Sequence, residues 1–258
     1  MKLTLGATCM MILLALLAAC LPLTTPPPPL PTETSAPTET ATPTFVWFPP
    51  TPTYTMFPTP SAIGTPTAVV GPEHGALLFS DDFNDPDLWT LGRSQAGSTA
   101  LGKNELSIAI NQPQGYLYST RQETSLSDFY LEVTANPSIC RGEDQYGLLL
   151  RLSSDVSYYR FALTCDGRTR LDRIYQGNAS APQAPMYSGA VPPGAPSISR
   201  LAVYAQGKEM RFYINDLYQF TVRDGTMLKG TISVFARAAG EDTMTVNFSD
   251  LDVYEVGE

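Results

Sequence analysis

The sequence Asp128-Phe-Tyr-Leu-Glu-Val-Thr-Ala135 alternates between two kinds of side chain without a break. One face of this stretch, drawn as an extended chain, carries only apolar residues: Phe129, Leu131, Val133 and Ala135. Successive side chains of a β-strand point to opposite faces of the sheet, so a period of two predicts a strand that is buried on one face only. The stretch therefore predicts a sheet with one face in a core.

Similar short segments recur from residue 77 to the end of the chain, and turn residues such as Asp166-Gly167 and Asn215-Asp216 separate them. No segment has a convincing helical period. About a dozen short strands joined in this way predict an all-β, antiparallel two-sheet sandwich, in one domain over residues 76–258. The predicted strands are 77–79, 105–110, 115–119, 128–135, 146–152, 158–164, 168–175, 198–206, 209–214, 217–222, 229–237 and 243–256, with a long loop at 177–196.

The first twenty residues form a separate segment of the export type. Lys2 supplies a positive charge, residues 3–17 are apolar, and small residues precede Cys20. This apolar core is too short for a bilayer of roughly 30 Å and predicts a signal peptide over residues 1–19. The run Leu17-Ala18-Ala19-Cys20 resembles the lipobox of bacterial lipoproteins. The resemblance implies a lipid on Cys20 that anchors the protein to the cell membrane, outside the cytoplasm; a plain secretory signal and a short membrane anchor are the alternatives.

Residues 20–75 have the composition of a tether. Thr-Pro and Pro-Thr steps dominate, and residues 21–72 contain no Lys or Arg. Proline fixes φ and lacks an N–H, so the segment predicts a disordered, extended linker. Its aromatic residues suggest either an anchor at the membrane interface or on wall polymer, or a segment that packs on the domain. These residues are Phe45, Trp47, Phe48, Tyr54 and Phe57.

Several stretches of the predicted domain, taken in order, resemble the concanavalin A-like lectins and glucanases, a superfamily that includes laminin G-like domains. The stretches are Asp81-Asp82-Phe83 with Trp89, Tyr146 to Arg151, Tyr158 to Phe161, Asp166-Gly167, Leu201 to Asp216, Gly230 to Ile232, and Val246 to Val253. Asp216 and Ser249 depart from the pattern, because Gly and Asp are common at those positions. The resemblance implies a jelly-roll sandwich that binds or cleaves glycans.

Two cysteines, Cys140 and Cys165, lie in the predicted domain. An exported protein meets an oxidising compartment, where disulfides form and persist. Cys140 precedes the strand at 146–152 and Cys165 ends the strand that pairs with it, so the hairpin brings the two together. We therefore predict a disulfide; a reactive or metal-binding pair is the alternative.

Catalytic motifs are not recognisable in the sequence. The one histidine, His74, stands at the edge of the domain, so neither a Ser-His-Asp triad nor a histidine-rich zinc site can be built inside it. The glucanases that the chain resembles carry a Glu-x-Asp-x-(x)-Glu pattern on one strand, and this pattern is absent. No catalytic residue is predicted, although a carboxylate pair formed by the fold stays open.

A structural calcium ion is a second implication of the resemblance. Relatives often bind a cation where the first and last strands run side by side, and Asp82 and Asp250 flank that place. Calcium needs six to eight oxygen ligands. The alternative is that both residues are ordinary turn carboxylates.

Aromatic and arginine side chains on outward strand positions are the candidate ligand-binding residues. Aromatic rings stack on sugar faces, and arginine offers a fork of donors to hydroxyl or carboxylate groups. The alternative is ordinary cross-strand pairing, since tyrosine is common in strands. The candidates are Tyr130, Arg151, Tyr158, Arg160, Tyr204 and Tyr213, with Arg173 from the strand before the loop.

The charge of the chain bears on its partners. The predicted domain has 22 acidic and 15 basic residues, and this excess of negative charge argues against nucleic acid. We therefore predict a cell-surface lipoprotein that displays a non-catalytic module for a polysaccharide or cell-wall glycan. The alternatives are a glycoside hydrolase-like enzyme with a carboxylate pair, and a structural or protein-binding domain.

Overall fold

A computed structural model describes residues 73–256 of the chain. The predicted signal peptide, Cys20, nearly all of the tether and its aromatic residues lie outside the described residues. Within residues 73–256, the structure has fifteen strands and one 3₁₀ turn, Pro86–Leu88. In this part of the chain no helix has the length and apolar character needed to cross a membrane.

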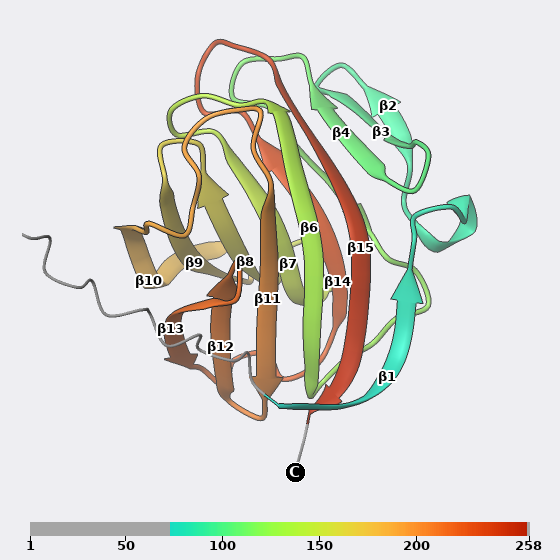
Figure 1. The fold of residues 1–258 in the computed structure, drawn as a ribbon, viewed down its shortest axis with the longest axis vertical. Coiled ribbons are helices and arrows are strands. Elements are labelled where there is room, and N and C mark those ends of the chain that lie inside the picture. The colour runs from blue at the N-terminus through green and yellow to red at the C-terminus, as the bar shows by residue number, and fades with distance from the viewer. Residues whose placement is uncertain (1–72, 257–258) are drawn as a thin grey trace, which may run out of the picture. The chain divides into compact units, whose positions relative to one another are not determined.

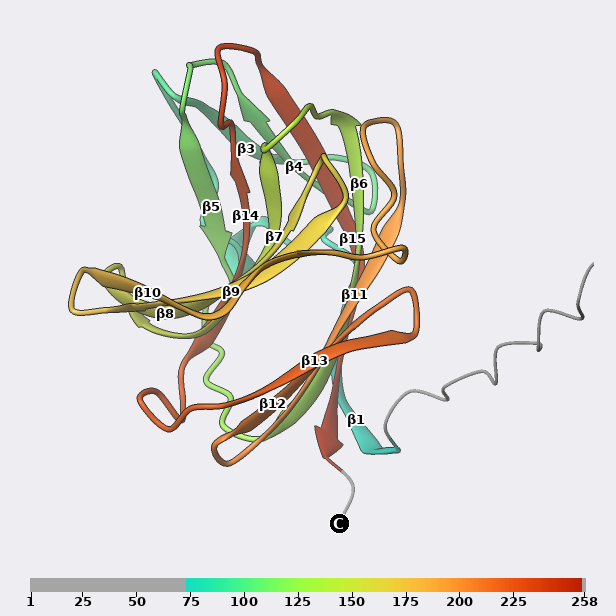
Figure 2. The same ribbon diagram turned by 90° about the vertical axis from the view of Figure 1, so that its left-hand side faces the viewer.

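The strands form two antiparallel sheets, and this confirms the predicted sandwich (Figure 1). The nine-stranded sheet has the order β13-β12-β11-β6-β15-β4-β3-β2, with β1 paired to β15, and the six-stranded sheet has the order β10-β9-β8-β7-β14-β5. Figure 2 shows the six-stranded sheet on the left and β6, β15 and β1 on the right. The strands are β1 (His74–Asp81), β2 (Gly92–Ser94), β3 (Gly97–Leu101), β4 (Leu106–Ile110), β5 (Tyr116–Thr120), β6 (Phe129–Ile139), β7 (Gln145–Ser154), β8 (Ser157–Thr164), β9 (Arg168–Tyr175), β10 (Asn178–Tyr187), β11 (Ser199–Gln206), β12 (Glu209–Ile214), β13 (Leu217–Arg223), β14 (Thr231–Arg237) and β15 (Met244–Val256).

The core lies between the inner faces of the two sheets. The apolar face of the predicted strand 128–135 is buried there, and the apolar side chains of β4, β8, β11, β14 and β15 surround it. Phe161 of β8 contacts Phe212 of β12 with 4.8 Å between ring centroids, and Phe212 contacts Phe220 of β13 at the same distance. These rings join the two sheets, because β8 belongs to one and β12 and β13 belong to the other.

The contacts of Asp81, at the end of β1, account for the sequence motif Asp81-Asp82-Phe83 with Trp89. Its buried carboxylate accepts hydrogen bonds from the Phe83 amide (2.9 Å), the Trp89 indole N–H (3.1 Å) and the Arg121 Nε (2.9 Å). Phe83 and Trp89 pack together in the core, with 5.0 Å between their ring centroids. The carboxylate thus fixes the turn after β1, and it is paired with a cation as a buried charge requires.

Three strands depart from the sequence prediction. The segment from 177 to 196 was predicted to be a loop, but Asn178–Tyr187 forms the edge strand β10 and pairs with β9. Pro182 and Pro185 concealed it, because proline is tolerated in a sheet only at edges and irregular positions. The register of β10 shifts twice along this stretch. The short strands β2 and β3 were also missed, since their small and polar residues lack an apolar period.

The predicted disulfide between Cys140 and Cys165 is present, with 5.8 Å between the two Cα atoms. It closes a loop over a sequence separation of 25 residues, which contains β7 and β8. Both cysteines are buried at one end of the core. The bond therefore restricts the unfolded chain around the β7–β8 hairpin in the middle of the six-stranded sheet.

Replacing both cysteines, as Cys140→Ser with Cys165→Ser, is expected to lower the free energy of unfolding by about 3 kcal/mol, because the unfolded chain regains its loop entropy. Urea denaturation of the full chain measures the loss. The unmutated chain under reducing conditions is the control and should lose the same amount. An unchanged denaturation midpoint would contradict this account of the bond.

Candidate functional site

The predicted ligand-binding residues do not form one row. Tyr130, Tyr204 and Tyr213 lie on the outer face of the nine-stranded sheet. Tyr158 and Arg160 lie on the outer face of the six-stranded sheet, on the opposite side of the molecule. The candidates therefore do not share one surface, because outward positions were predicted strand by strand and the sequence does not show which sheet each strand joins.

Arg151 corrects the prediction in a second way, because its side chain is fully buried. The residue has a φ of 50° where the pairing of β7 with β8 and β14 is irregular, so the strand alternation is broken there. Its guanidinium donates to the carbonyl oxygens of Met227 (3.1 Å) and Ser127 (2.9 Å). Burial lowers the pKa of Arg151. The Arg151 side chain therefore holds together, from within the protein, the two loops that contain Ser127 and Met227, and it is not available to a ligand.

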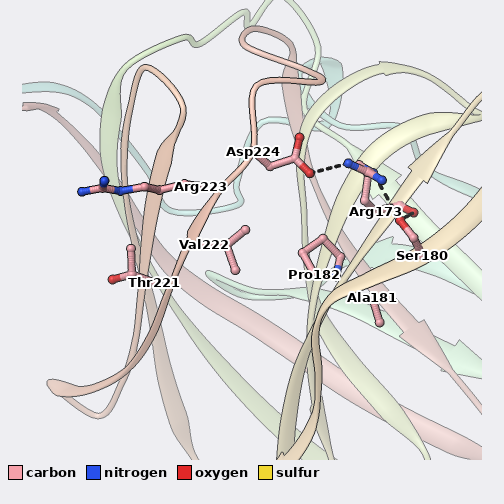
Figure 3. A pocket seen from close by; sticks show the side chains of 8 residues that line it. All are labelled: Arg173, Ser180, Ala181, Pro182, Thr221, Val222, Arg223 and Asp224. Carbon is pink, nitrogen blue, oxygen red and sulfur yellow. Dashed lines mark hydrogen bonds and ion pairs between the residues drawn. The ribbon is translucent and has the colours of Figure 1, made fainter.

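Arg173 lies in a third place, at a pocket of about 480 Å³ between β10 and β13 (Figure 3). Its Nη1 atom is 2.6 Å from Oδ2 of Asp224, and its Nε donates to Ser180 Oγ at 3.2 Å. Asp224 also accepts a hydrogen bond from the hydroxyl of the buried Tyr159, at 2.8 Å. These contacts satisfy Arg173, so its first role is to join the β9–β10 hairpin to the segment after β13.

The tyrosines of the nine-stranded sheet mostly contact one another. Tyr130, Tyr204 and Tyr213 are each less than a tenth exposed, and Tyr254 packs beside them. His74 stacks on Tyr130, with 5.1 Å between ring centroids and 8° between the ring planes. The Tyr130 hydroxyl donates to Glu132. Burial first, and then this carboxylate, raise the pKa of Tyr130. The cluster offers little free ring surface to a ligand.

The outer face of the six-stranded sheet has a different character. Its middle strands place Leu149, Ala162 and Phe235 on this face, and all three are fully buried. Tyr116 and Tyr118 from β5 pack against this patch, and Tyr158 from β8 is part of it. The Tyr116 and Phe235 ring centroids are 5.8 Å apart. These side chains form a small apolar cluster on the outer face, with tyrosines packed over and around it.

The sheet bends around this face. In Figure 2, β5 and β14 stand upright whereas β8 and β10 lie nearly horizontal and project to the left, so the outer face lies inside the angle between them. In a flat sheet, β5 and β8 would be about 14 Å apart, since two strands separate them. Nevertheless, burial first, and then the nearby Tyr158 hydroxyl, raise the pKa of Tyr116. Side chains from the two arms therefore approach each other above the middle strands.

Asp172 of β9 holds two arginines at the edge of this face. Its Oδ2 accepts from Nε (3.1 Å) and Nη2 (2.7 Å) of Arg160, and its Oδ1 accepts from Nε (3.1 Å) and Nη2 of Arg170. The Asp172 side chain is 4% exposed, whereas those of Arg160 and Arg170 are 15% and 24% exposed. Each arginine thus gives two charge-assisted hydrogen bonds to a single carboxylate oxygen, and bonds of this kind are strong. The carboxylate therefore orients both guanidinium groups toward the face.

Two buried polar atoms on this face have no hydrogen-bond partner among the described residues, namely Tyr116 Oη and Gln145 Oε1. Gln145 is 6% exposed. Both residues flank Arg237 in the strand register, Tyr116 on β5 and Gln145 on β7. Buried polar groups in native proteins are nearly always satisfied by protein, water or ligand. Tyr116, Tyr118 and Gln145 were not among the site residues predicted from the sequence. The alternation of Tyr116 and Tyr118 with the apolar Leu117 was the signal that could have identified the two tyrosines.

Acidic side chains are scarce on this face, within residues 73–256. Asp172 is committed to two arginines, and Asp155, in the β7–β8 turn, accepts a hydrogen bond from the Tyr118 hydroxyl at 3.2 Å. Burial first, and then Asp155, raise the pKa of Tyr118. The middle of the face carries the apolar side chains of Leu149 and Phe235. The arrangement is suited to holding a ligand.

The calcium prediction rests on the ends of β1 and β15, which pair as expected, with Asp81 opposite Leu251. Asp82 accepts from the backbone and the side-chain amide of Asn84, and Asp250 accepts from Ser249 Oγ. The part of the chain that the structure describes contains no group of three or more His, Cys, Asp or Glu side chains able to hold a metal. The calcium site at Asp82 and Asp250 therefore remains a prediction.

No protein-family model matches the sequence, and neither does any curated protein. Solved structures are similar in fold. The carbohydrate-binding module CBM66 from Bacillus subtilis has a TM-score of 0.54 and 16% identity, over 65% of this chain and 96% of that chain. A β-glucanase from Bacillus licheniformis has a TM-score of 0.53 and 11% identity, over 71% and 100%. A Bacillus subtilis protein of unknown function with a galectin-like fold has a TM-score of 0.54 and 16% identity, over 72% and 99%. The domain therefore has the concanavalin A-like jelly-roll fold that the sequence motifs predicted.

Proposed function

We propose that the domain is a non-catalytic glycan-binding module and that the outer face of the six-stranded sheet is its binding surface. The observation that carries the proposal is the combination, on one outer face, of a tyrosine-rich aromatic cluster with two arginines that Asp172 holds. On the same face the buried Gln145 Oε1 has no hydrogen-bond partner among the described residues. A polyhydroxylated ligand would supply the missing hydrogen bonds.

The chemistry of the face fits a sugar in two respects. Tyr118 is partly exposed and offers a ring whose apolar face can stack on the C–H groups of a pyranose. Tyr158 is 9% exposed and belongs to the apolar cluster beneath. Arg160 and Arg170 are held by Asp172, so little side-chain entropy is lost when they bind hydroxyl groups. Preorganised donors beside an apolar floor are what a carbohydrate site requires.

The structural neighbours support the same class of ligand. One is a carbohydrate-binding module, and others are a β-glucanase and the catalytic domain of an endo-1,3-β-glucanase from Thermotoga petrophila. We favour binding over hydrolysis for this chain, because Asp172 is committed to two arginines and the middle of the face is apolar. A glycosidase needs two available carboxyl groups at roughly 5 to 9.5 Å.

We further propose that the module is displayed as a lipoprotein, with the lipid on Cys20 and residues 21–72 as the spacer. The support is the small-residue run before Cys20 and the Pro/Thr composition after it. An extended spacer of about fifty residues reaches on the order of 150 Å. This length allows the module to contact wall polymers or external polysaccharides away from the membrane.

Tyr118→Ala and Tyr158→Ala are each expected to weaken polysaccharide binding about tenfold, because truncating an aromatic anchor removes a large share of the contact energy. Affinity electrophoresis of the full chain in laminarin, levan and xylan, with retention on insoluble cell wall, measures the effect. Tyr187→Ala is the matched control, since Tyr187 is 75% exposed on the edge strand β10. Equal weakening in all three variants would contradict the site.

The same incubations report on catalysis when reducing ends are measured. Retention of a polysaccharide without release of sugar is the expected result. Sustained release that Asp172→Asn abolishes would overturn the non-catalytic assignment, because it would show that this carboxylate takes part in cleavage.

Cys20→Ala is expected to move the protein from the membrane fraction to the soluble extracytoplasmic fraction, because the thiol that accepts the lipid is lost. Metabolic labelling with a radioactive fatty acid, followed by fractionation, measures both consequences. Cys9→Ala, in the segment that would be removed, is the control and should retain label and membrane association. Retention of label by Cys20→Ala would contradict the lipoprotein assignment.

A further inference from the structure

The outer face of the six-stranded sheet carries several arginines, although the whole chain has a formal net charge of −9. Arg168 is paired there with Glu143 and Asp166, Arg160 and Arg170 share Asp172, and Arg237 has no carboxylate partner among the described residues. Arg160, Arg170 and Arg237 are therefore the candidates for a ligand. We propose that the bound glycan is anionic and that these arginines bind its carboxylate or sulfate groups. This inference rests on the proposed glycan-binding function and specifies the chemical class of the ligand.

The first element of the argument is the pair of arginines around Asp172. Each arginine uses Nε and Nη2 on the carboxylate, and neither Nη1 makes a hydrogen bond to a residue in the described range. The shared carboxylate is almost inaccessible, whereas both guanidinium groups reach the surface. Two cations with free donors therefore lie at this edge of the face, and the group of Arg160, Arg170 and Asp172 retains a net positive charge.

Arg237 on β14 is the second element. It is partly buried, and within residues 73–256 it has no ion-pair or side-chain hydrogen-bond partner, although most arginines of the domain are paired with a carboxylate. Its cross-strand neighbours are Tyr116 and Gln145. Its guanidinium therefore has free donors on this face, and an anionic ligand would supply the counter-charge that the described residues do not.

The third element is that Arg237 and the two unsatisfied polar atoms belong to adjacent strands of one sheet. The unsatisfied Tyr116 Oη belongs to the residue directly opposite Arg237 on β5, and the unsatisfied Gln145 Oε1 belongs to the residue opposite it on β7. A tyrosine hydroxyl donates to an anion, and a glutamine amide can rotate to present its NH₂ group. Guanidinium, hydroxyl and amide together form a donor set for a carboxylate or a sulfate. A neutral sugar would leave Arg237 without a counter-charge.

The test compares polymers that differ in charge. Polygalacturonate and its fully methyl-esterified form share a backbone, as do dextran sulfate and dextran, and the two pairs separate carboxylate from sulfate. The full unmutated chain is expected to bind one or both charged polymers at least tenfold more tightly than the uncharged partner. The preference should fall when NaCl is raised from 50 to 300 mM. This comparison does not depend on the folding of any variant.

Variants then locate the charge recognition. Arg237→Gln is expected to reduce the preference for the charged polymer about fivefold or more, whereas Arg93→Gln, on strand β2 of the other sheet, should leave it unchanged. Thermal melts confirm that both variants are folded, and Arg170→Gln replaces Arg237→Gln if the latter is not. Equal losses in the β2 variant and the β14 or β9 variant would overturn the assignment, because general electrostatics would explain them.

The outcomes separate this inference from the function on which it rests. Equal binding of charged and uncharged polymers, or binding of neutral polysaccharides alone, would overturn the anionic ligand and leave glycan binding standing. Failure to bind any charged or neutral polysaccharide would overturn both. Tight, salt-sensitive binding of polygalacturonate or dextran sulfate that depends on Arg237 supports both.

Discussion

The burial of one face of each sheet in a shared core is the constraint on which the rest of this structure depends. Phe161, Phe212 and Phe220 contact one another across the two layers, so β8 must direct Phe161 inward. Alternation along the same strand then directs Tyr158 and Arg160 outward. The residues of the proposed site are therefore placed by the packing of the core behind them.

The outward-facing side chains of the two sheets find their packing and hydrogen-bond partners in different ways. On the nine-stranded sheet, Tyr130, Tyr204 and Tyr213 pack together, and the Tyr130 hydroxyl is satisfied by Glu132. On the six-stranded sheet, the bend brings β5 toward β8, and polar atoms of Tyr116 and Gln145 are buried without partners. Under the proposed function, a bound ligand would supply the hydrogen-bond partners that the second face lacks. This difference is why we place the function on the six-stranded sheet.

Local patterns in the sequence predicted most strands well and the assembly of the site poorly. The strand 128–135 was predicted with the correct buried face, because its alternation is continuous. Arg151 was misplaced because the irregularity in β7 breaks that alternation, and a positive φ at an arginine leaves no mark in the sequence. The strand at 115–119 was predicted, but the sequence could not show that Tyr116 and Tyr118 belong to the candidate site, because the bend of the sheet brings them toward β7 and β8.

The most direct test of the central claim is to map the bound ligand on the folded domain. Backbone amide chemical shifts of the isotope-labelled chain would be followed during titration with fragments of a polysaccharide that it retains. The account predicts that the perturbed amides belong to β5, β14, β7, β8 and β9. Perturbations confined to β6, β11 and β12 would place the ligand on the nine-stranded sheet and contradict the account.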